Sequence, residues 1–545
     1  MLEHYFSVIN RRWPEYWDLT ALSDFGEQTA YTYGQLATEM ARLGVLFGAL
    51  GIERGDKLAL CSTNRANWAV AFLGIEAYGA TAVSILPDFL PQDVEKLVHH
   101  SDARLLFVNG SKWQRMNPAT MPNLEIVLNL EDFTPLYCRN AAIVQRYEAW
   151  DREWEVAYPD GFNRENIHYV DTNMDEIALI NYTSGTTSSP KGVMLSWRSL
   201  SSNAQFGTEH FPCQPGENMV NMLPLAHMFG MMFEFLYPIQ NGIHVHFITK
   251  MATPILMRAF AECKPYLILT VPLVIEKIYS KKLAAVVNKP IVRALWNMPV
   301  LGAIVRRKIR SGLMTAFGGQ IRAFIVGGAA LNGEVERCLL DVRFPLLVGY
   351  GMTECGPLIG YVPWQEFVPH SCGRIVDRME VRIDSYDPAS TPGEIQVRGD
   401  AVMLGYYKND AATKASFTPD GWLRTGDMGV IDAQGNMYIK GRCKTMLLGP
   451  SGQNIYPEEL EEKLMNQPGI GEVIVVSRAT KLVALIYPDP DFRFPEGETV
   501  TQRMELNRQA VNRELPAYSQ IAAIELRDTE FEKTPKRSIK RFLYS

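Results

Sequence analysis

Hydroxyl side chains gather around a glycine and a lysine in the stretch YTSGTTSSPKGVMLS, residues 182–196. Backbone N–H groups and hydroxyl donors in a loop of this composition can surround the oxygen atoms of a phosphate. The stretch is not a Walker A loop, because that motif needs Ser or Thr directly after its lysine, and here Gly192 follows Lys191. A phosphate-binding loop and a polar surface turn both fit this composition, so the remaining sequence has to decide between them.

The residues on both sides of the loop predict the elements that would hold it. The β-branched and apolar run EIALINYT, residues 176–183, predicts a strand that ends where the loop begins. Ser196 is a residue type that begins helices, and the residues after it predict a helix. The loop is therefore expected directly after a strand end.

Six further stretches with glycines or polar residues follow along the chain. They are LPLAHMFG (223–230), GGAAL (327–331), GYGMTE (349–354), GEIQVRG (393–399), GWLRTGDMG (421–429) and GRCKTMLLGPSGQNIYPEELE (441–461). Glu354 follows a glycine turn, where a carboxylate can hold a Mg²⁺ ion that bridges phosphate oxygens. His227 stands in an apolar run, which fits a hydrogen-bonded core histidine as well as a functional one.

Helical and strand patterns alternate between residues 30 and 110. AYTYGQLATEMARLGVLFGALGI and WAVAFLGIEAYGA are helical, and KLALCS and TAVSIL are strand-like, which predicts an α/β domain with largely parallel sheets. PYLILTVP, IRAFIVGGAAL and PLLVGYGMTE predict three apolar strands, and glycine turns follow the last two, at the strand ends where open α/β sheets bind ligands. A β-rich segment is expected from about residue 375, followed by a compact α+β domain.

Composition excludes several classes of protein. The chain has 545 residues with 47% hydrophobic content, enough for a large core, and its net charge of -6 does not indicate a nucleic-acid-binding protein. The N-terminus lacks the apolar core of a signal peptide, and no uncharged run is long enough to span a bilayer. The eight cysteines have no CxxC spacing, which argues against a structural zinc or a disulfide framework and favours a reducing cytoplasm.

Taken together and in this order, the seven stretches closely resemble those of the adenylate-forming superfamily of acyl-CoA synthetases, luciferases and nonribosomal-peptide adenylation domains. The resemblance runs from about residue 28 to the C-terminus. The final tract FEKTPKRSIKRFLY is similar to the ending of bacterial long-chain fatty acyl-CoA synthetases. The resemblance implies that a carboxylate attacks the α-phosphate of ATP, and that the thiol of coenzyme A then attacks the acyl-adenylate and releases AMP.

The resemblance assigns nucleotide-binding roles residue by residue. The β- and γ-phosphates would be held by Thr183, Ser184, Gly185, Thr186 and Thr187, with Lys191 adding positive charge. The adenine would lie in a slot of Gly328, Ala329, Ala330 and Tyr350, with Gly351 and Met352 adjoining it. Thr353 would contact the α-phosphate, Glu354 would hold Mg²⁺, Asp427 would accept hydrogen bonds from both ribose hydroxyls, and Arg442 would support that region.

The resemblance also implies an organisation in two domains. An AMP- and acyl-binding domain would span residues 1–441, and a mobile α+β lid would span residues 442–545, with its hinge near Lys444. After adenylation the lid would rotate, so that Gly452 and its neighbours line the tunnel for the pantetheine arm. His227 would line the carboxylate end of the acyl site.

One catalytic position departs from the family pattern. The closing motif usually resembles KTPxGKIxR, with a lysine that stabilises charge on the α-phosphate and the acyl carboxylate. Aligned on Thr534, Pro535, Ile539 and Arg541, the chain has Ser538 at that lysine. Lys536 and Lys540 lie two positions away on either side, and Lys540 is the expected replacement because it keeps the KR ending intact. Slower or lost adenylation is the alternative.

The sequence leaves the acid and the acceptor open. MFGMMFEFLYPI fits either an apolar acyl tunnel or plain core. A long-chain fatty acid with coenzyme A is the expected substrate pair. The alternatives are another carboxylic acid, a separate carrier protein as acceptor, and an adenylation-impaired binder of nucleotide or acyl-adenylate. Loose membrane association and the oligomeric state also remain open.

Overall fold

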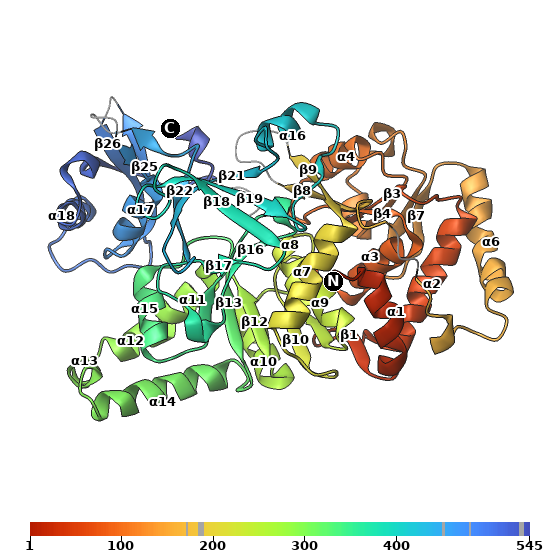
Figure 1. The fold of residues 1–545 in the computed structure, drawn as a ribbon, viewed down its shortest axis with the longest axis horizontal. Coiled ribbons are helices and arrows are strands. Elements are labelled where there is room, and N and C mark those ends of the chain that lie inside the picture. The colour runs from red at the N-terminus through yellow and green to blue at the C-terminus, as the bar shows by residue number, and fades with distance from the viewer. Residues whose placement is uncertain (170–172, 184–189, 449–452, 479–480, 534–538, 545) are drawn as a thin grey trace.

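The computed structural model describes residues 1–169, 173–183, 190–448, 453–478, 481–533 and 539–544. A large N-terminal domain of helix-covered sheets adjoins a smaller C-terminal α+β domain, drawn in blue in Figure 1. The predicted α/β class is confirmed. Among the described residues, no helix is both long and apolar enough to cross a membrane.

An eight-stranded sheet carries the predicted loop, in the order β20-β9-β8-β4-β3-β5-β6-β7. Its strands are β3 (Lys57–Cys61), β4 (Thr81–Ser84), β5 (Leu105–Val108), β6 (Ile126–Asn129), β7 (Pro135–Cys138), β8 (Ile177–Thr183), β9 (Lys191–Ser196) and β20 (Gly405–Tyr406). The five central strands are parallel, and β7, β9 and β20 are antiparallel to their neighbours. The helices that accompany this sheet are α2 (Tyr33–Ala49), α3 (Ala66–Tyr78), α4 (Pro91–His100), α5 (Gly110–Trp113) and α6 (Ala141–Ala157).

The predicted strand before the loop is confirmed as β8, and the predicted helix after Ser196 is confirmed as α7 (Trp197–His210). The Ser196 hydroxyl accepts a hydrogen bond from the N–H of Ser199 at 3.2 Å, as an N-cap should. The sequence did not predict β9 between the two, because that strand is defined by its pairing with β8 and β20.

Two further sheets form the middle of the N-terminal domain. One is the four-stranded sheet β10 (Asn218–Asn221), β11 (His244–Phe247), β1 (Thr20–Asp24) and β2 (Ala30–Thr32). The other is the parallel sheet β12 (Leu267–Thr270), β13 (Ala323–Val326) and β14 (Leu346–Val348), which confirms the three apolar strands expected in this part of the chain. Helices α1 (Tyr5–Tyr16), α8 (Met228–Met231), α9 (Tyr237–Gln240), α10 (Thr253–Cys263) and α15 (Gly333–Asp341) accompany them.

The predicted β-rich segment is also confirmed. Its strands are β15 (Tyr350–Gly351), β16 (Leu358–Tyr361), β17 (Arg374–Ile375), β18 (Met379–Asp384), β19 (Gly393–Gly399), β21 (Leu423–Ile431) and β22 (Met437–Arg442), and its helix is α16 (Asp410–Ser416). Strands β18, β19, β21 and β22 form one antiparallel sheet. This sheet lies between the N-terminal sheets and the C-terminal domain in Figure 1.

The C-terminal domain packs two helices against a three-stranded sheet. Its elements are β23 (Leu447–Leu448), β24 (Asn454–Ile455), α17 (Pro457–Met465), β25 (Ile470–Arg478), β26 (Lys481–Pro488), α18 (Val500–Asn512) and β27 (Ile521–Leu526). A separate apolar core, which includes Leu460, Val475 and Val511, holds it together. The compact α+β domain expected after the β-rich segment is thus confirmed, and its last strand, β27, is parallel to β26.

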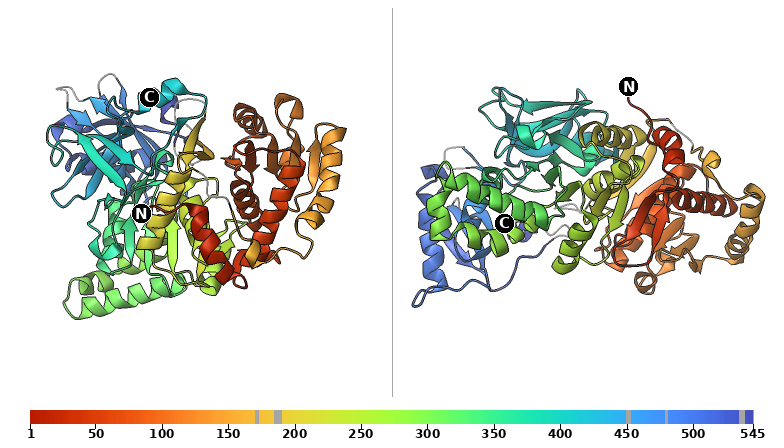
Figure 2. Two further views of the ribbon diagram at one scale, coloured as in Figure 1. Left: turned by 45° about the vertical axis from the view of Figure 1, so that its right-hand side comes forward. Right: turned by 90° about the horizontal axis from the view of Figure 1, so that it is seen from below.

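A helical hairpin projects from the N-terminal domain near α15. Helices α11 (Pro272–Ile278) and α12 (Ala284–Val287) lead into α13 (Pro290–Trp296) and α14 (Leu301–Ala316). In Figure 1 and in the left view of Figure 2, α14 forms the lower edge of the molecule.

Two histidines stack inside the four-stranded sheet. The ring centroids of His244 and His246 lie 3.7 Å apart, and both rings share hydrogen bonds with the hydroxyl of Ser23. Burial lowers the pKa of His244 to about 4 and that of His246 to about 3. Both rings therefore remain neutral in the folded protein at pH values at which an exposed histidine is charged.

We expect this pair to make the fold sensitive to acid. Between pH 6.5 and about 4 the unfolded chain binds protons that the folded chain does not, so stability falls as the pH falls. The loss is on the order of 3 kcal/mol per ring. Nearby Asp24, whose burial raises its pKa to about 6, acts in the opposite direction over part of this range. The measurement is therefore the difference in the free energy of unfolding in urea between wild type and His244→Gln/His246→Gln, taken at pH 7 and at pH 4. A stability gap that does not change with pH would contradict the prediction.

Candidate active site

Strands β8 and β9 fix both ends of the predicted phosphate loop. Thr183 and Lys191 are the paired residues at the end of this antiparallel ladder. Ser184, Gly185, Thr186 and Thr187 lie outside the described residues. The Lys191 ammonium nitrogen lies 4.6 Å from the centroid of the Tyr406 ring, a cation–π contact that holds the lysine at the mouth of the loop.

The same tyrosine connects the loop to the predicted metal ligand. The Tyr406 hydroxyl donates a hydrogen bond to Glu354 Oε1 at 2.8 Å, and the N–H of Met403 donates to the Glu354 carbonyl oxygen at 2.8 Å. Burial raises the pKa of Tyr406, so the phenol remains a donor. A cation and a carboxylate thus flank one aromatic ring. The sequence did not single out Tyr406, because its two partners are distant in the chain.

Asp427 is the centre of the predicted ribose site. Its side chain is 5% exposed, its Oδ2 accepts a hydrogen bond from the Tyr350 hydroxyl at 2.6 Å, and its Oδ1 lies 2.8 Å from Arg442 Nε. Burial raises the pKa of Asp427, and the Arg442 guanidinium opposes this shift. Glu354 is close enough for its charge to raise that pKa as well. The structure therefore brings the residues predicted for adenine, ribose and metal into one neighbourhood.

The predicted adenine slot follows the end of β13. Gly328, Ala329 and Ala330 are exposed, and Gly328 has φ +86°, a conformation that favours glycine. A Cβ on Gly327 would lie 3.1 Å from the Phe229 ring and 3.7 Å from the Gly349 carbonyl oxygen. The ends of β13 and β14 and the start of α8 therefore meet beside a small-residue surface that a flat ring can approach.

Gly351 sets the position of the turn that carries Thr353 and Glu354. A Cβ at this residue would lie 2.3 Å from the Pro357 carbonyl oxygen, so only glycine fits without a backbone shift. The N–H of Met352 donates to that same oxygen at 2.9 Å. Thr353 is buried in the turn that follows, and Glu354 is half-buried.

His227 begins α8, and its Nδ1 accepts a hydrogen bond from the N–H of Phe229 at 3.4 Å. A buried acid fixes the loop before it: Glu234 Oε2 accepts hydrogen bonds from the N–H groups of Met222 and Leu223 at 3.0 and 2.8 Å. Asn221 donates to the same oxygen at 2.9 Å. The single acidic residue in the apolar run MFGMMFEFLYPI is the sequence feature that could have predicted these hydrogen bonds. The Met and Phe residues of that run, apart from the half-buried Phe229, are buried in the main core.

The remaining predicted residues lie on the C-terminal side. Lys444 is exposed in the turn after β22, and next to it the Thr445 hydroxyl donates to Glu458 Oε1 at 2.6 Å. Gly452 lies outside the described residues. Lys540 is not among the residues gathered around Asp427 and Glu354. Its ammonium lies 3.4 Å from Glu532 Oε2, and its N–H donates to the Glu532 carbonyl oxygen at 2.8 Å.

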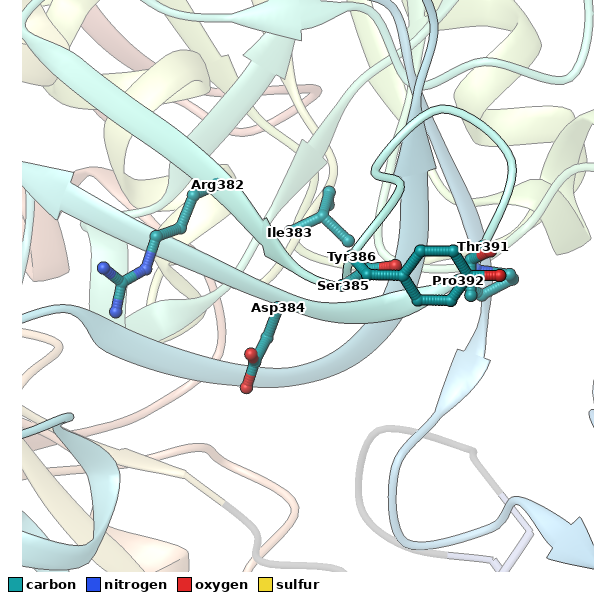
Figure 3. A pocket seen from close by; sticks show the side chains of 7 residues that line it. All are labelled: Arg382, Ile383, Asp384, Ser385, Tyr386, Thr391 and Pro392. Atoms are coloured by element: carbon teal, nitrogen blue, oxygen red, sulfur yellow. The ribbon is translucent and has the colours of Figure 1, made fainter.

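A surface depression at the β18–β19 turn lies apart from this neighbourhood (Figure 3). It is lined by Arg382, Ile383, Asp384, Ser385, Tyr386, Thr391 and Pro392. The Tyr386 side chain, labelled at the turn in Figure 3, is almost fully exposed. The depression contains no predicted site residue, so we assign it no part in the chemistry.

Comparison with known proteins agrees with this geometry. The sequence profile of the AMP-binding enzyme family matches residues 9–407, and the profile of the AMP-binding enzyme C-terminal domain matches residues 445–544. A long-chain-fatty-acid–CoA ligase of Mycobacterium bovis is 28% identical over 506 residues, covering 88% of this chain and 80% of that protein. 4-Coumarate–CoA ligase 1 of Arabidopsis thaliana is 26% identical over 471 residues, covering 82% and 76%.

Among solved structures, ATP-bound MatB from Rhodopseudomonas palustris superposes with a TM-score of 0.77 at 20% identity, covering 100% of this chain and 98% of that one. At this identity the likeness establishes the fold alone. The profile match extends over most of the chain and includes the residues predicted for the phosphate loop, the adenine slot and the Glu354 turn. The chain therefore belongs to the AMP-binding enzyme family, within the adenylate-forming superfamily of acyl-CoA ligases.

Proposed function

We propose that the chain is an AMP-forming acid–CoA ligase whose acid is a long-chain fatty acid. The observation that carries the nucleotide half of this proposal is the hydrogen-bonded group of Asp427, Tyr350 and Arg442 beside Glu354. The long-chain acid is supported by the relative from Mycobacterium bovis. The eight cysteines are free thiols in the structure, which fits a reducing compartment, and we propose the cytoplasm.

ATP would lie along this group of residues. Asp427 would accept hydrogen bonds from both ribose hydroxyls, since one carboxylate can span a vicinal diol. Tyr350 and the exposed residues Gly328, Ala329 and Ala330 would enclose the adenine, with Gly351 and Met352 beside them. Thr353 would contact the α-phosphate. Thr183, Lys191 and the loop between them would hold the β- and γ-phosphates.

Glu354 would hold the magnesium ion that accompanies ATP. A carboxylate oxygen is a ligand that Mg²⁺ prefers, and this one lies beside the tyrosine that contacts Lys191. When bound, the ion offsets negative charge on the phosphate oxygens. The hydrogen bond from the Tyr406 hydroxyl to Oε1 would orient the Glu354 carboxylate for binding this ion.

The acid and coenzyme A would bind next to the nucleotide. His227, half-buried at the start of α8, would line the carboxylate end of the acyl site. We propose a division into residues 1–441 and 442–545, with Lys444 at the hinge and Gly452 near the pantetheine arm. Its exposed position after β22 supports Lys444 as the residue that changes conformation. Lys540 would supply the charge that Ser538 cannot.

A second acid remains a candidate for a specific reason. The 4-coumarate–CoA ligase of Arabidopsis thaliana matches nearly as much of the chain at nearly the same identity. In addition, the Met and Phe residues after His227 are packed in the core, so they do not favour a long acyl chain over a ring. Fold likeness alone does not decide the substrate.

The deciding measurement is acid-dependent ATP–pyrophosphate exchange with saturated fatty acids of graded length and with 4-coumarate. We expect exchange to rise with chain length, because each buried methylene adds about 0.8 kcal/mol of binding. AMP release should then depend on coenzyme A.

Two outcomes would contradict the assignment in different ways. Highest exchange with 4-coumarate would replace the fatty acid by an aromatic acid and leave the ligase intact. No exchange with any acid, together with measurable ATP binding by calorimetry, would favour the adenylation-impaired binder that the serine at position 538 suggests.

A further inference from the structure

The hairpin of α13 and α14 belongs to the most basic part of the chain. Residues 277–333 contain ten lysines and arginines and no acidic residue, whereas the whole chain has a net charge of -6. Several of these cations are exposed on the hairpin itself, among them Lys289, Arg293, Arg307 and Lys308. Within the described part of the chain, none of these four lies within 4.0 Å of a carboxylate. Their charge is therefore directed to the outside.

The same hairpin exposes large apolar side chains. Ile291 is 74% exposed, Val300 is 71% exposed and Ile304 is 59% exposed, and Met298 and Leu301 between them are each 47% exposed. Ile291 lies at the start of α13, and the other four lie in or next to the turn that joins α13 to α14, which forms one corner of the molecule in Figure 1. Scattered exposed apolar residues are normal, but a group at one convex corner marks an interaction site.

The hairpin is a built structure and holds these side chains in place. A Cβ on Gly302 would lie 2.3 Å from the Trp296 carbonyl oxygen, so the two helices are packed as closely as glycine allows. Arg306 donates a hydrogen bond to that same oxygen. The indole N–H of Trp296 donates to Asp341 of α15 at 3.3 Å, which ties the hairpin to the body of the domain.

The exposed face of α14 combines the two properties. Ile304, Arg307 and Lys308 are all exposed and are spaced three and four residues apart, so they share one side of the helix. Arg307 and Lys308 lie about 5 Å along the helix axis from Ile304. An apolar end followed by cations at this distance matches the passage from acyl chains to headgroups at a membrane surface.

We propose that this hairpin docks the protein on an anionic lipid bilayer, with the turn at 297–300 and the start of α14 inserted among the headgroups and Arg307 and Lys308 bound to lipid phosphates. Charge complementarity favours anionic lipid, because the hairpin is basic and is attracted to that surface. The rest of the chain is acidic and is repelled by it, so the hairpin would face the lipid. The convex shape favours a bilayer over a folded protein, because a bilayer accepts protruding side chains without a matching pocket. This inference does not depend on which acid the enzyme uses.

The test is co-sedimentation of the full-length protein with phosphatidylcholine vesicles, with and without phosphatidylglycerol. We expect binding only with phosphatidylglycerol, and release at high salt. Arg307→Gln/Lys308→Gln should lower the vesicle partition coefficient roughly 30-fold, since each cation near an anionic surface contributes about a fivefold effect. Val300→Ser/Ile304→Ser should lower it roughly 100-fold, from the loss of two buried apolar side chains.

The matched control is Arg493→Gln/Arg513→Gln, which removes the same charge from exposed positions of the C-terminal domain. It should bind vesicles like wild type. All variants should keep the thermal midpoint and the activity on a soluble acid, because the changed side chains are exposed. Equal loss of binding in the control, or no vesicle binding by wild type, would overturn the proposal. Binding of an acidic carrier protein that depends on the hairpin, without vesicle binding, would overturn it in favour of a protein partner.

Discussion

Replacement of Asp427 by alanine is expected to lower kcat/KM for ATP in the adenylation half-reaction by roughly 10²–10⁴-fold. The carboxylate is buried and accepts from Tyr350 on one oxygen, while Arg442 lies beside the other. Under the proposed function it also accepts from both ribose hydroxyls. Two hydrogen bonds to a charged group contribute about 3–6 kcal/mol together, which is the source of the expected range.

Altered nucleotides separate this role from a structural one. With wild type, 2′-deoxy-ATP and 3′-deoxy-ATP should each lose part of the binding energy, since each lacks one hydroxyl. With Asp427→Ala they should lose nothing further, because the acceptor is already gone. Tyr350→Phe is the matched control: it removes one neighbour of the carboxylate but leaves the carboxylate in place, so the penalty for the deoxynucleotides should persist.

A purely structural aspartate would behave differently. Asp427→Ala leaves the Tyr350 hydroxyl without the acceptor that it has now, so the thermal midpoint should fall in any case. If activity with ATP fell only in proportion to the folded fraction, and the deoxynucleotide penalty persisted in Asp427→Ala, the ribose assignment would be wrong. The two readouts together therefore distinguish binding from folding.

Local patterns predicted most of the fold because the elements concerned are long or strongly apolar. The strands β8, β12, β13 and β14 lie in strongly apolar runs, and Ser196 is a strong N-cap. The strands β9 and β27 were missed because each pairs with a strand that is distant in the chain, β20 for β9 and β26 for β27. Long-range pairing, rather than local propensity, makes these residues strands.

The candidate site was likewise predictable from local motifs but not from long-range contacts. Motif order indicated Asp427, Tyr350 and Glu354 as separate functional residues, and the direct bond between the first two was visible only in three dimensions. Tyr406 and Glu234 lie outside the seven stretches, and their hydrogen bonds to Glu354 and Leu223 inside those stretches were visible only in three dimensions. A single sequence reveals which residues can do chemistry, but not the second layer of residues that orients them.

Lys540→Ala is expected to lower fatty-acid-dependent ATP–pyrophosphate exchange roughly 10²–10³-fold, the effect of removing one group that stabilises transition-state charge. Thioester formation from a preformed acyl-adenylate should stay within a few-fold of wild type, because in that step no carboxylate attacks the α-phosphate of ATP. The family position itself is Ser538, which has no charge to offer. Lys536→Ala is the matched control on the other side of that serine.

The C-terminal stem decides how such a lysine could reach the phosphate. Lys533 and Ile539 form an antiparallel bridge, and Arg541 pairs with the half-buried Glu461, so both arms of the stem are anchored. Lys540 lies on one arm and is paired with Glu532 on the other at 3.4 Å. Both side chains of this pair are accessible to solvent, so breaking it costs about 1 kcal/mol or less. The pairing is therefore weak enough to be exchanged for a contact with ATP.

Two further variants separate catalysis from support of the stem. Glu532→Gln frees Lys540 from its partner, so it should leave exchange unchanged or raise it, whereas a stem-supporting pair would make it as harmful as Lys540→Ala. Ser538→Lys in the Lys540→Ala background should restore exchange, since it returns the charge to the family position. If Lys540→Ala keeps full exchange, the charge comes from elsewhere; if Ser538→Lys alone raises exchange about 100-fold, the natural chain is impaired in adenylation. Whether Lys540 supplies the positive charge for adenylation thus decides between an active ligase and an adenylation-impaired nucleotide binder.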